Sequence, residues 1–112
     1  MTVIQKNKTF RTVYEKGKSR ATKFLVMYRL PREGDTVRIG VSVSKRVGGA
    51  VLRNKIRRRV KEAFRLREKS VAARIRAVAG ADVVFVARPA AGQACYAEIA
   101  ESVDFLLGKF GL

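Results

Sequence analysis

Apolar and polar residues alternate along two neighbouring segments in the first half of the chain. Between residues 37 and 43 every second side chain is apolar, namely Val37, Ile39, Val41 and Val43. This period of two is typical of a strand that buries one face. Residues 23–30 predict an earlier strand, which has on one side Phe24, Val26, Tyr28 and Leu30. Because a turn at 31–35 separates the two segments, we predict an antiparallel hairpin.

A helical period marks the segments around these strands. The first pattern predicts a short helix that is capped by Asn7 or Thr9 and runs to about Lys16, with one face formed by Phe10, Val13 and Tyr14. A long helix should follow Gly48 and Gly49 and continue to about Ala79, with Ser70 as an alternative end. Its apolar arc comprises Leu52, Ile56, Val60, Ala63 and Phe64. Residues 94–110 predict a last amphipathic helix without an evident N-cap.

A short run at 82–87 is rich in β-branched residues and suits a buried strand that ends before Pro89. The predicted order is therefore α-β-β-α-β-α. We expect an α+β fold in which helices pack against a small mixed sheet. A length of 112 residues with 47% hydrophobic residues suits one domain, spanning 1–112, with a substantial core.

Charge adds a functional constraint to this fold. The formal net charge is +16, far above what solubility requires, and all but two of the cations lie in residues 1–76. Such a concentration of like charge opposes compaction, so an anionic partner is expected to neutralise it. An uneven distribution of this kind favours a nucleic-acid-binding face.

The residues that are missing exclude several kinds of chemistry. The chain has no histidine and one cysteine, Cys95, so the usual zinc sites, a Cys-His or Ser-His catalytic pair and an intrachain disulfide are excluded. No phosphate-binding glycine motif is present, and Gly92-Gln93 reads as a loop sequence. We expect no catalytic side chain, no metal bound by the protein, no membrane contact and a cytoplasmic location.

The strongest functional signal is the basic stretch at 45–61, which contains no acid. An ordinary solvated helix face would carry interspersed acids. Guanidinium groups bind phosphate in a bidentate manner, and an amide can contact a 2′-hydroxyl. We therefore predict RNA contact by Lys45, Arg46, Arg53, Asn54, Lys55, Arg57, Arg58 and Lys61.

Three aromatic residues, Phe10, Tyr14 and Tyr28, allow two interpretations. Their spacing is what an ordinary hydrophobic core requires, and pattern alone favours that interpretation for Phe10 and Tyr14. They could instead line a groove in which single-stranded bases stack. Nearby cations would then surround this groove with positive charge, namely Lys6, Lys8, Arg11, Lys18 and Arg20.

Residues 38–64 resemble the signature of the bacterial ribonuclease P protein subunit. The run from Ser42 to Lys45, then Gly49-Ala-Val-Leu-Arg-Asn-Lys55, and finally Ala63-Phe64, matches the family pattern in order. Phe10, Tyr14 and Gly17 resemble the family's first helix, and residues 82–90 resemble its third strand. The resemblance covers nearly the whole chain.

The resemblance implies a protein that pairs with a large catalytic RNA to remove the 5′ leader of precursor tRNA by endonucleolytic cleavage. Magnesium ions bound by that RNA would perform the hydrolysis, and no protein partner would be required. Arg53, Asn54 and Lys55 would occupy the family's Arg-Asn-Arg positions, and the leader would lie in a cleft with Phe10, Tyr14 and Tyr28. The family's crossover between parallel strands is left-handed, against the general rule.

One departure from the family pattern concerns Lys55, which stands where the family usually has a second arginine. Lysine keeps the charge but loses the planar fork. The alternative functions are a structural RNA-binding protein of ribosomal type and a nonspecific DNA-compacting protein. Composition allows both, but neither accounts for the ordered motif.

Overall fold

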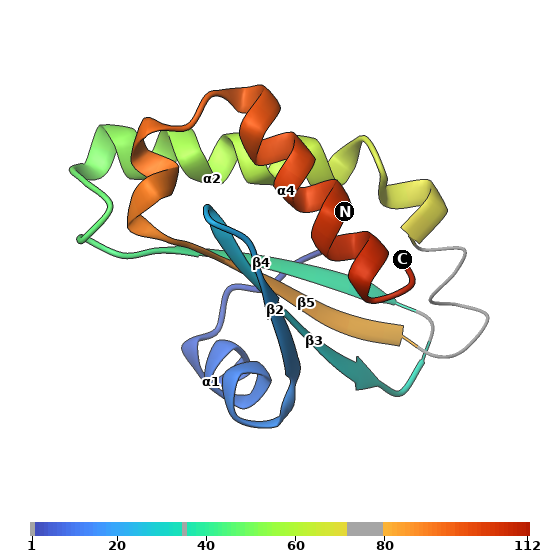
Figure 1. The fold of residues 1–112 in the computed structure, drawn as a ribbon. Coiled ribbons are helices and arrows are strands. Elements are labelled where there is room, and N and C mark those ends of the chain that lie inside the picture. Colours follow the sequence, from blue (N-terminus) through green and yellow to red (C-terminus); the bar gives the residue numbers. More distant parts are fainter. Residues whose placement is uncertain (1, 35, 72–79) are drawn as a thin grey trace.

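The fold is a five-stranded mixed sheet with helices on both faces (Figure 1). A computed structural model describes residues 2–34, 36–71 and 80–112. The elements are β1 (Thr2–Val3), α1 (Asn7–Lys16), β2 (Lys18–Ala21), β3 (Leu25–Arg32), β4 (Val37–Val43), α2 (Ala50–Arg65), β5 (Gly80–Ala87), the 3-10 helix η1 (Pro89–Gln93) and α4 (Tyr96–Lys109). The predicted α+β class is confirmed.

The strand order is β1-β4-β5-β3-β2. β5 pairs in parallel with β4 and antiparallel with β3, so β3 and β4 are not neighbours. The predicted hairpin is therefore wrong. Seven of the eight residues of β5 are buried, and a strand that is apolar on both faces is most stable in the middle of a sheet. The connection from β4 through α2 to β5 joins parallel neighbours, the unit for which the resemblance implies a left-handed crossover.

Two layers of helices divide the core. α2 and α4 cover one face of the sheet, and α1 lies on the other (Figure 1). The larger apolar cluster joins α2 and α4 to the side chains of Leu25, Met27, Ile39 and Phe85. The smaller cluster lies under α1 and contains Ile4, Val13 and Val84. Within the described residues no helix is long and apolar enough to cross a membrane.

The connection between β4 and α2 contains a turn at 45–47 followed by two glycines. Gly48 has φ 157°. Gly49 is the N-cap of α2, and the carbonyl of Gly49 accepts a hydrogen bond from the Arg53 amide at 2.9 Å. The glycines were predicted to form the turn that leads into the helix; the turn lies just before them, and they connect it to α2. α2 ends at Arg65, earlier than predicted, and a turn at 66–67 precedes a short helical stretch at 68–71. The expected continuation at 72–79 lies outside the described residues.

The start of α4 is capped by residues that are poor sequence signals. Cys95 is the N-cap, and its backbone amide donates a hydrogen bond to the carboxylate of Glu98 at 3.0 Å. This hydrogen bond holds the pKa of Glu98 below its usual value. Cysteine is not among the residues that favour N-caps, which explains why the sequence predicts the helix but not its start.

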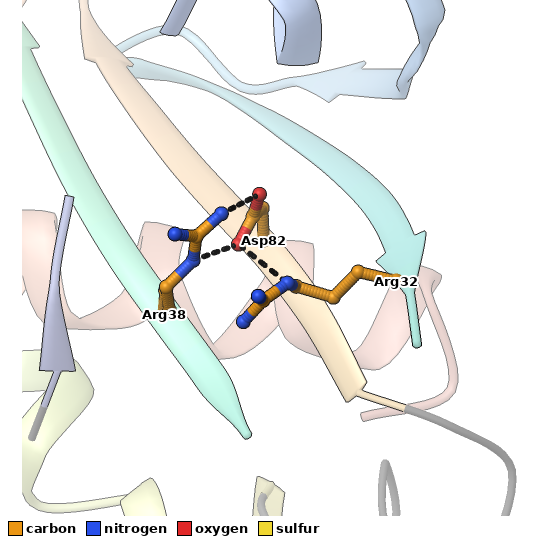
Figure 2. A network of polar contacts seen from close by, with 3 residues as sticks. All are labelled: Arg32, Arg38 and Asp82. Carbon is orange, nitrogen blue, oxygen red and sulfur yellow. Dashed lines mark hydrogen bonds and ion pairs between the residues drawn. The ribbon is translucent and has the colours of Figure 1, made fainter. Parts of the chain in front are cut away.

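A buried carboxylate joins three strands of the sheet. Figure 2 shows Arg38 of β4 and Arg32 of β3 pointing toward Asp82 of β5, whose side chain is 6% exposed. Arg38 donates two hydrogen bonds, from Nε at 2.7 Å and Nη2 at 2.8 Å. Arg32 Nε is more distant, at 3.8 Å. The hydrogen bonds to Asp82 hold the pKa of Arg38 above its usual value.

Replacement of Arg38 by Ala should therefore lower the free energy of unfolding by about 1.5–3 kcal/mol, because Asp82 loses both charged hydrogen bonds. Arg32→Ala is the matched control, since it removes a long ion pair from a part-exposed side chain and should cost about 0–1 kcal/mol. Denaturation in urea measures the free energy of unfolding of both variants. An equal decrease in the free energy of unfolding of the two variants would show that the bidentate contact of Arg38 does not stabilise the buried Asp82 carboxylate.

Candidate nucleic-acid interface

A groove runs between α1, the edge of β4 and α2. Its volume is about 410 Å³, and it is lined by Asn7, Phe10, Arg11, Tyr14, Val41, Ser42, Val43 and Arg57. The edge of β4 is available because β1 pairs only with Arg38 and Ile39 of this strand. Residues far apart in sequence thus meet in one concave surface, which is lined by aromatic, aliphatic, polar and cationic residues.

The aromatic residues form a continuous row beside this groove. The ring centroids of Phe10 and Tyr14 are 6.3 Å apart, and those of Tyr14 and Tyr28 are 5.0 Å apart in an edge-to-face arrangement. Tyr14 is 37% exposed, whereas Phe10 and Tyr28 are half-buried. Phe10 and Tyr14 line the groove, and Tyr28 packs against Tyr14 without being one of the lining residues.

Phe10 can lie against the sheet because β4 has a glycine beneath it. A Cβ atom added to Gly40 would lie 2.7 Å from ring atoms of Phe10. A larger residue at position 40 would therefore push the ring away from β4. The buried apolar residue of the same helix is Val13, which is 0% exposed. Val13 is thus the residue of α1 that packs in the core, whereas Phe10 and Tyr14 line the groove.

The basic stretch supplies the opposite wall of the groove. Arg53, Arg57 and Lys61 recur at every fourth position of α2 and follow one flank of its apolar arc. Arg57 lines the groove, and its Nη1 donates a hydrogen bond to Asn54 Oδ1 at 2.8 Å. Lys45 and Arg46 are exposed in the turn that precedes the helix. Arg57 thus supplies the cationic side of the groove that faces α1, and the other four cations extend positive charge along α2 and the preceding turn.

The other flank of α2 faces a different surface. Lys55 and Arg58 line a cavity of about 270 Å³ together with Arg59, Glu62 and Tyr96. The predicted RNA-binding residues are therefore split between two faces of the helix.

Some cations of the basic stretch have partners within the protein. Arg59 Nη1 donates a hydrogen bond to the carbonyl of Ala94 at 2.9 Å, which ties α2 to the start of α4. Arg65 and Glu62 form a bidentate pair at 2.6 and 2.9 Å, so the pKa of Glu62 is lowered and that of Arg65 is raised. Arg53 is half-buried, and its Nε is buried without a partner among the described residues.

The sequence interpretation of the surrounding cations needs one correction. Of the five cations, Arg11 does line the groove, but Lys6 and Lys8 do not. Lys18 and Arg20 lie on β2 and line a separate pocket. Asn7 and Ser42 of the groove were not predicted. The available signal was the spacing of Asn7, Arg11 and Tyr14, which places these three residues on one side of a helix.

The fold and this groove define a small basic α+β protein that has a cationic, aromatic-lined surface. The family model for ribonuclease P matches residues 2–111. The chain belongs to the ribonuclease P protein family. It is accordingly a subunit of a tRNA-processing ribonucleoprotein enzyme.

Individual relatives agree with this assignment over nearly the full length. The chain is 44% identical to the ribonuclease P protein component of Clostridium kluyveri, covering 97% of this chain and 94% of the relative. It is 42% identical to that of Clostridioides difficile, covering 95% and 89%. The ribonuclease P protein of Staphylococcus aureus has a TM-score of 0.82 at 36% identity, covering 96% and 94%. That of Thermotoga maritima has a TM-score of 0.80 at 26% identity, covering 97% of each chain.

Proposed function

We propose that the whole chain acts as one RNA-binding domain, which docks on the ribonuclease P RNA in the cytoplasm and holds the 5′ leader of precursor tRNA during its removal. The observation that carries this proposal is the groove, in which Phe10 and Tyr14 of α1 face the same space as Arg57 of α2. Aromatic faces and guanidinium groups in one groove suit single-stranded RNA, because bases stack and phosphates pair at the same time.

Each side chain of the groove has a distinct role in this proposal. The rings of Phe10 and Tyr14 stack with leader bases, which tolerates any sequence since every base has a π-face. Arg11 neutralises leader phosphates on one side, and Arg57 on the other side pairs with phosphates of both the leader and the catalytic RNA. Tyr28 holds Tyr14 in place by its edge contact. Asn54, held by Arg57, offers neutral donors to the RNA.

The remaining cations of α2 and of the preceding turn bind the catalytic RNA in this proposal. Lys45 and Arg46 project from the turn, and Lys55, Arg58 and Lys61 extend the positive surface around the helix. Lys55 keeps a point charge where a bidentate arginine contact would otherwise form. Arg53 lies at the border of the core and the surface, so its head group has little freedom to rearrange.

The phosphodiester hydrolysis itself is proposed to use magnesium ions bound by the RNA. Among the described residues, no group of three acidic, histidine or cysteine side chains is placed to hold a metal ion. The protein contributes by positioning the substrate and by offsetting the charge repulsion between two RNA molecules. Addition of the protein to the RNA should therefore accelerate cleavage most at low magnesium. Cleavage no faster than with RNA alone would contradict the proposal and favour a structural RNA-binding role.

Replacement of Tyr14 by Ala should weaken the binding of precursor tRNA to the holoenzyme by about 1–3 kcal/mol, the contribution of one base stack. Phe10→Ala should weaken the binding of precursor tRNA by a similar amount. Mature tRNA has no leader, so its affinity should hardly change. The preference for precursor over mature tRNA should then shrink by about 5- to 150-fold. Equilibrium binding of both ligands measures this ratio.

Two controls separate stacking from folding. Tyr14→Phe keeps the ring and should retain most of the preference. Leu66→Ala shortens an apolar side chain that is 61% exposed at the end of α2, and it should leave both affinities unchanged. Melting curves of the free variants identify any loss of fold. Equal weakening of precursor and mature tRNA would assign Phe10 and Tyr14 to the core and refute the leader groove.

A further inference from the structure

A second cationic pocket lies at the opposite edge of the sheet from the groove. Its volume is about 480 Å³, and it is lined by Lys18, Ser19, Arg20, Arg29, Lys109 and Phe110. Two strands, β5 and β3, separate β4 from β2 in the sheet. This β2-edge pocket therefore shares no lining residue with the groove. A ligand that fills the groove leaves the β2-edge pocket unfilled.

The strand register explains why the cations meet there. β2 pairs antiparallel with β3, with Lys18 opposite Arg29 and Arg20 opposite Met27. Directly opposed residues of an antiparallel pair point to the same face. Met27 is buried in the core under α2 and α4, so the three cations are directed to that face beside the end of α4. Lys109, in the last turn of α4, completes the set.

The guanidinium group of Arg29 is only partly satisfied by hydrogen bonds within the protein. Its Nη1 donates a long hydrogen bond to the carbonyl of Phe110 at 3.4 Å. Its Nε is buried and has no hydrogen-bond partner among the described residues. None of the described residues that line the pocket is acidic. Converging cations without a counter-charge repel one another, and a bound anion would relieve this repulsion.

A simpler account covers only part of these observations. Exposed edge strands often carry lysine or arginine because charge prevents pairing with another sheet. This explains Lys18 and Arg20, since all four residues of β2 are exposed. It does not explain Arg29, which lies on an inner strand with a buried, unpartnered Nε, or Lys109, which comes from a helix. Cations from three elements around one cavity indicate a binding site.

We propose that the β2-edge pocket binds backbone phosphates of RNA, as a second anchoring point separate from the groove and from α2. Arginine fits a phosphate with a planar fork, and the lysines supply point charges around it. This inference rests on the proposed function, because a second anchoring point has a role only if the groove and α2 bind the same RNA. The phosphates come from the ribonuclease P RNA or from the precursor tRNA, and two binding measurements distinguish these sources.

The test compares the salt dependence of binding for Arg20→Ala, Lys109→Ala and the double variant. Each lost phosphate contact should reduce the slope of log K against log salt by about 0.7–0.9, and the double variant by about twice that. Lys69→Ala is the matched control, because it removes one exposed charge elsewhere and should leave the slope unchanged. Arg29 is left intact, since its removal from a half-buried site could disturb the fold.

The two measurements are binding of the protein to the ribonuclease P RNA alone and binding of precursor tRNA to the assembled holoenzyme. A reduced slope in the first assigns the pocket to the RNA subunit, and a reduced slope only in the second assigns it to the precursor. Wild-type slopes in both would overturn the inference, as would an equal change in Lys69→Ala. If Arg57→Ala still reduces the slope while Arg20→Ala does not, the proposed function stands and the inference alone fails.

Discussion

Replacement of Phe64 by Ala should lower the free energy of unfolding by about 3–5 kcal/mol, a large part of the stability of an ordinary domain. Phe64 is 1% exposed and lies on α2. Its ring meets that of Phe85 on the central strand edge to face, with centroids 6.1 Å apart. The substitution leaves a cavity between the helix and the sheet, because neighbouring rigid elements can collapse only in part. Denaturation of the free protein in urea measures the loss.

The matched controls for Phe64 lie nearby on the same helix or at its end. Leu66→Ala shortens an apolar side chain that is 61% exposed and should change stability by less than about 0.5 kcal/mol. Asn54→Ala should also leave stability nearly unchanged, although it removes a proposed RNA contact. Similar losses for Phe64→Ala and Leu66→Ala would mean that α2 does not depend on this ring for its attachment.

Binding of the ribonuclease P RNA should weaken steeply with salt. If Lys45, Arg46, Arg53, Arg57, Arg58 and Lys61 each contact one phosphate, these six contacts alone should give a slope of log K against log salt of about −4 to −5. The affinity should then fall by about a thousandfold between 50 and 200 mM salt. The reason is that each neutralised phosphate releases a condensed counterion, and this release is less favourable when the bulk salt concentration is high.

Single substitutions identify which side chains contribute to that slope. Arg57→Ala and Lys61→Ala should each reduce it by about 0.7–0.9. Asn54→Ala removes no charge, so it should lower the affinity while the slope stays at the wild-type value. Lys69→Ala is the control for loss of net charge. An unchanged slope in both Arg57→Ala and Lys61→Ala would remove these side chains from the RNA interface.

The helices were predictable because their patterns are local. The period of three to four residues in α1, α2 and α4 depends on which side chains share a face, and that follows from the helical geometry alone. The helix boundaries were less predictable. α2 ends at Arg65 although the apolar pattern continues, and α4 begins at Tyr96 after the N-cap Cys95, a residue type that carries little capping signal.

The arrangement of the strands was not predictable in the same way. The alternation in β4 correctly identifies Ile39, Val41 and Val43 as the core face. It contains no information about which strand lies beside β4. β5 inserts between β3 and β4 because its apolar residues need cover on both faces, and this choice depends on pairing between residues at least 44 positions apart. The exposed edge strand β2 has no apolar pattern and was missed.

The sequence by itself determined the class of fold, the basic helix, the aromatic residues of α1 and, through the ordered motif at 38–64, the family. Only the tertiary structure decided which of these residues meet. Arg57 and Tyr14 face one groove because α1 and α2 lie on opposite faces of the sheet and β4 ends between them. Lys18 and Arg20 lie at the other edge because β2 pairs with β3. Charge and periodicity are properties of the local chain, whereas the partition of cations between two sites depends on sheet order.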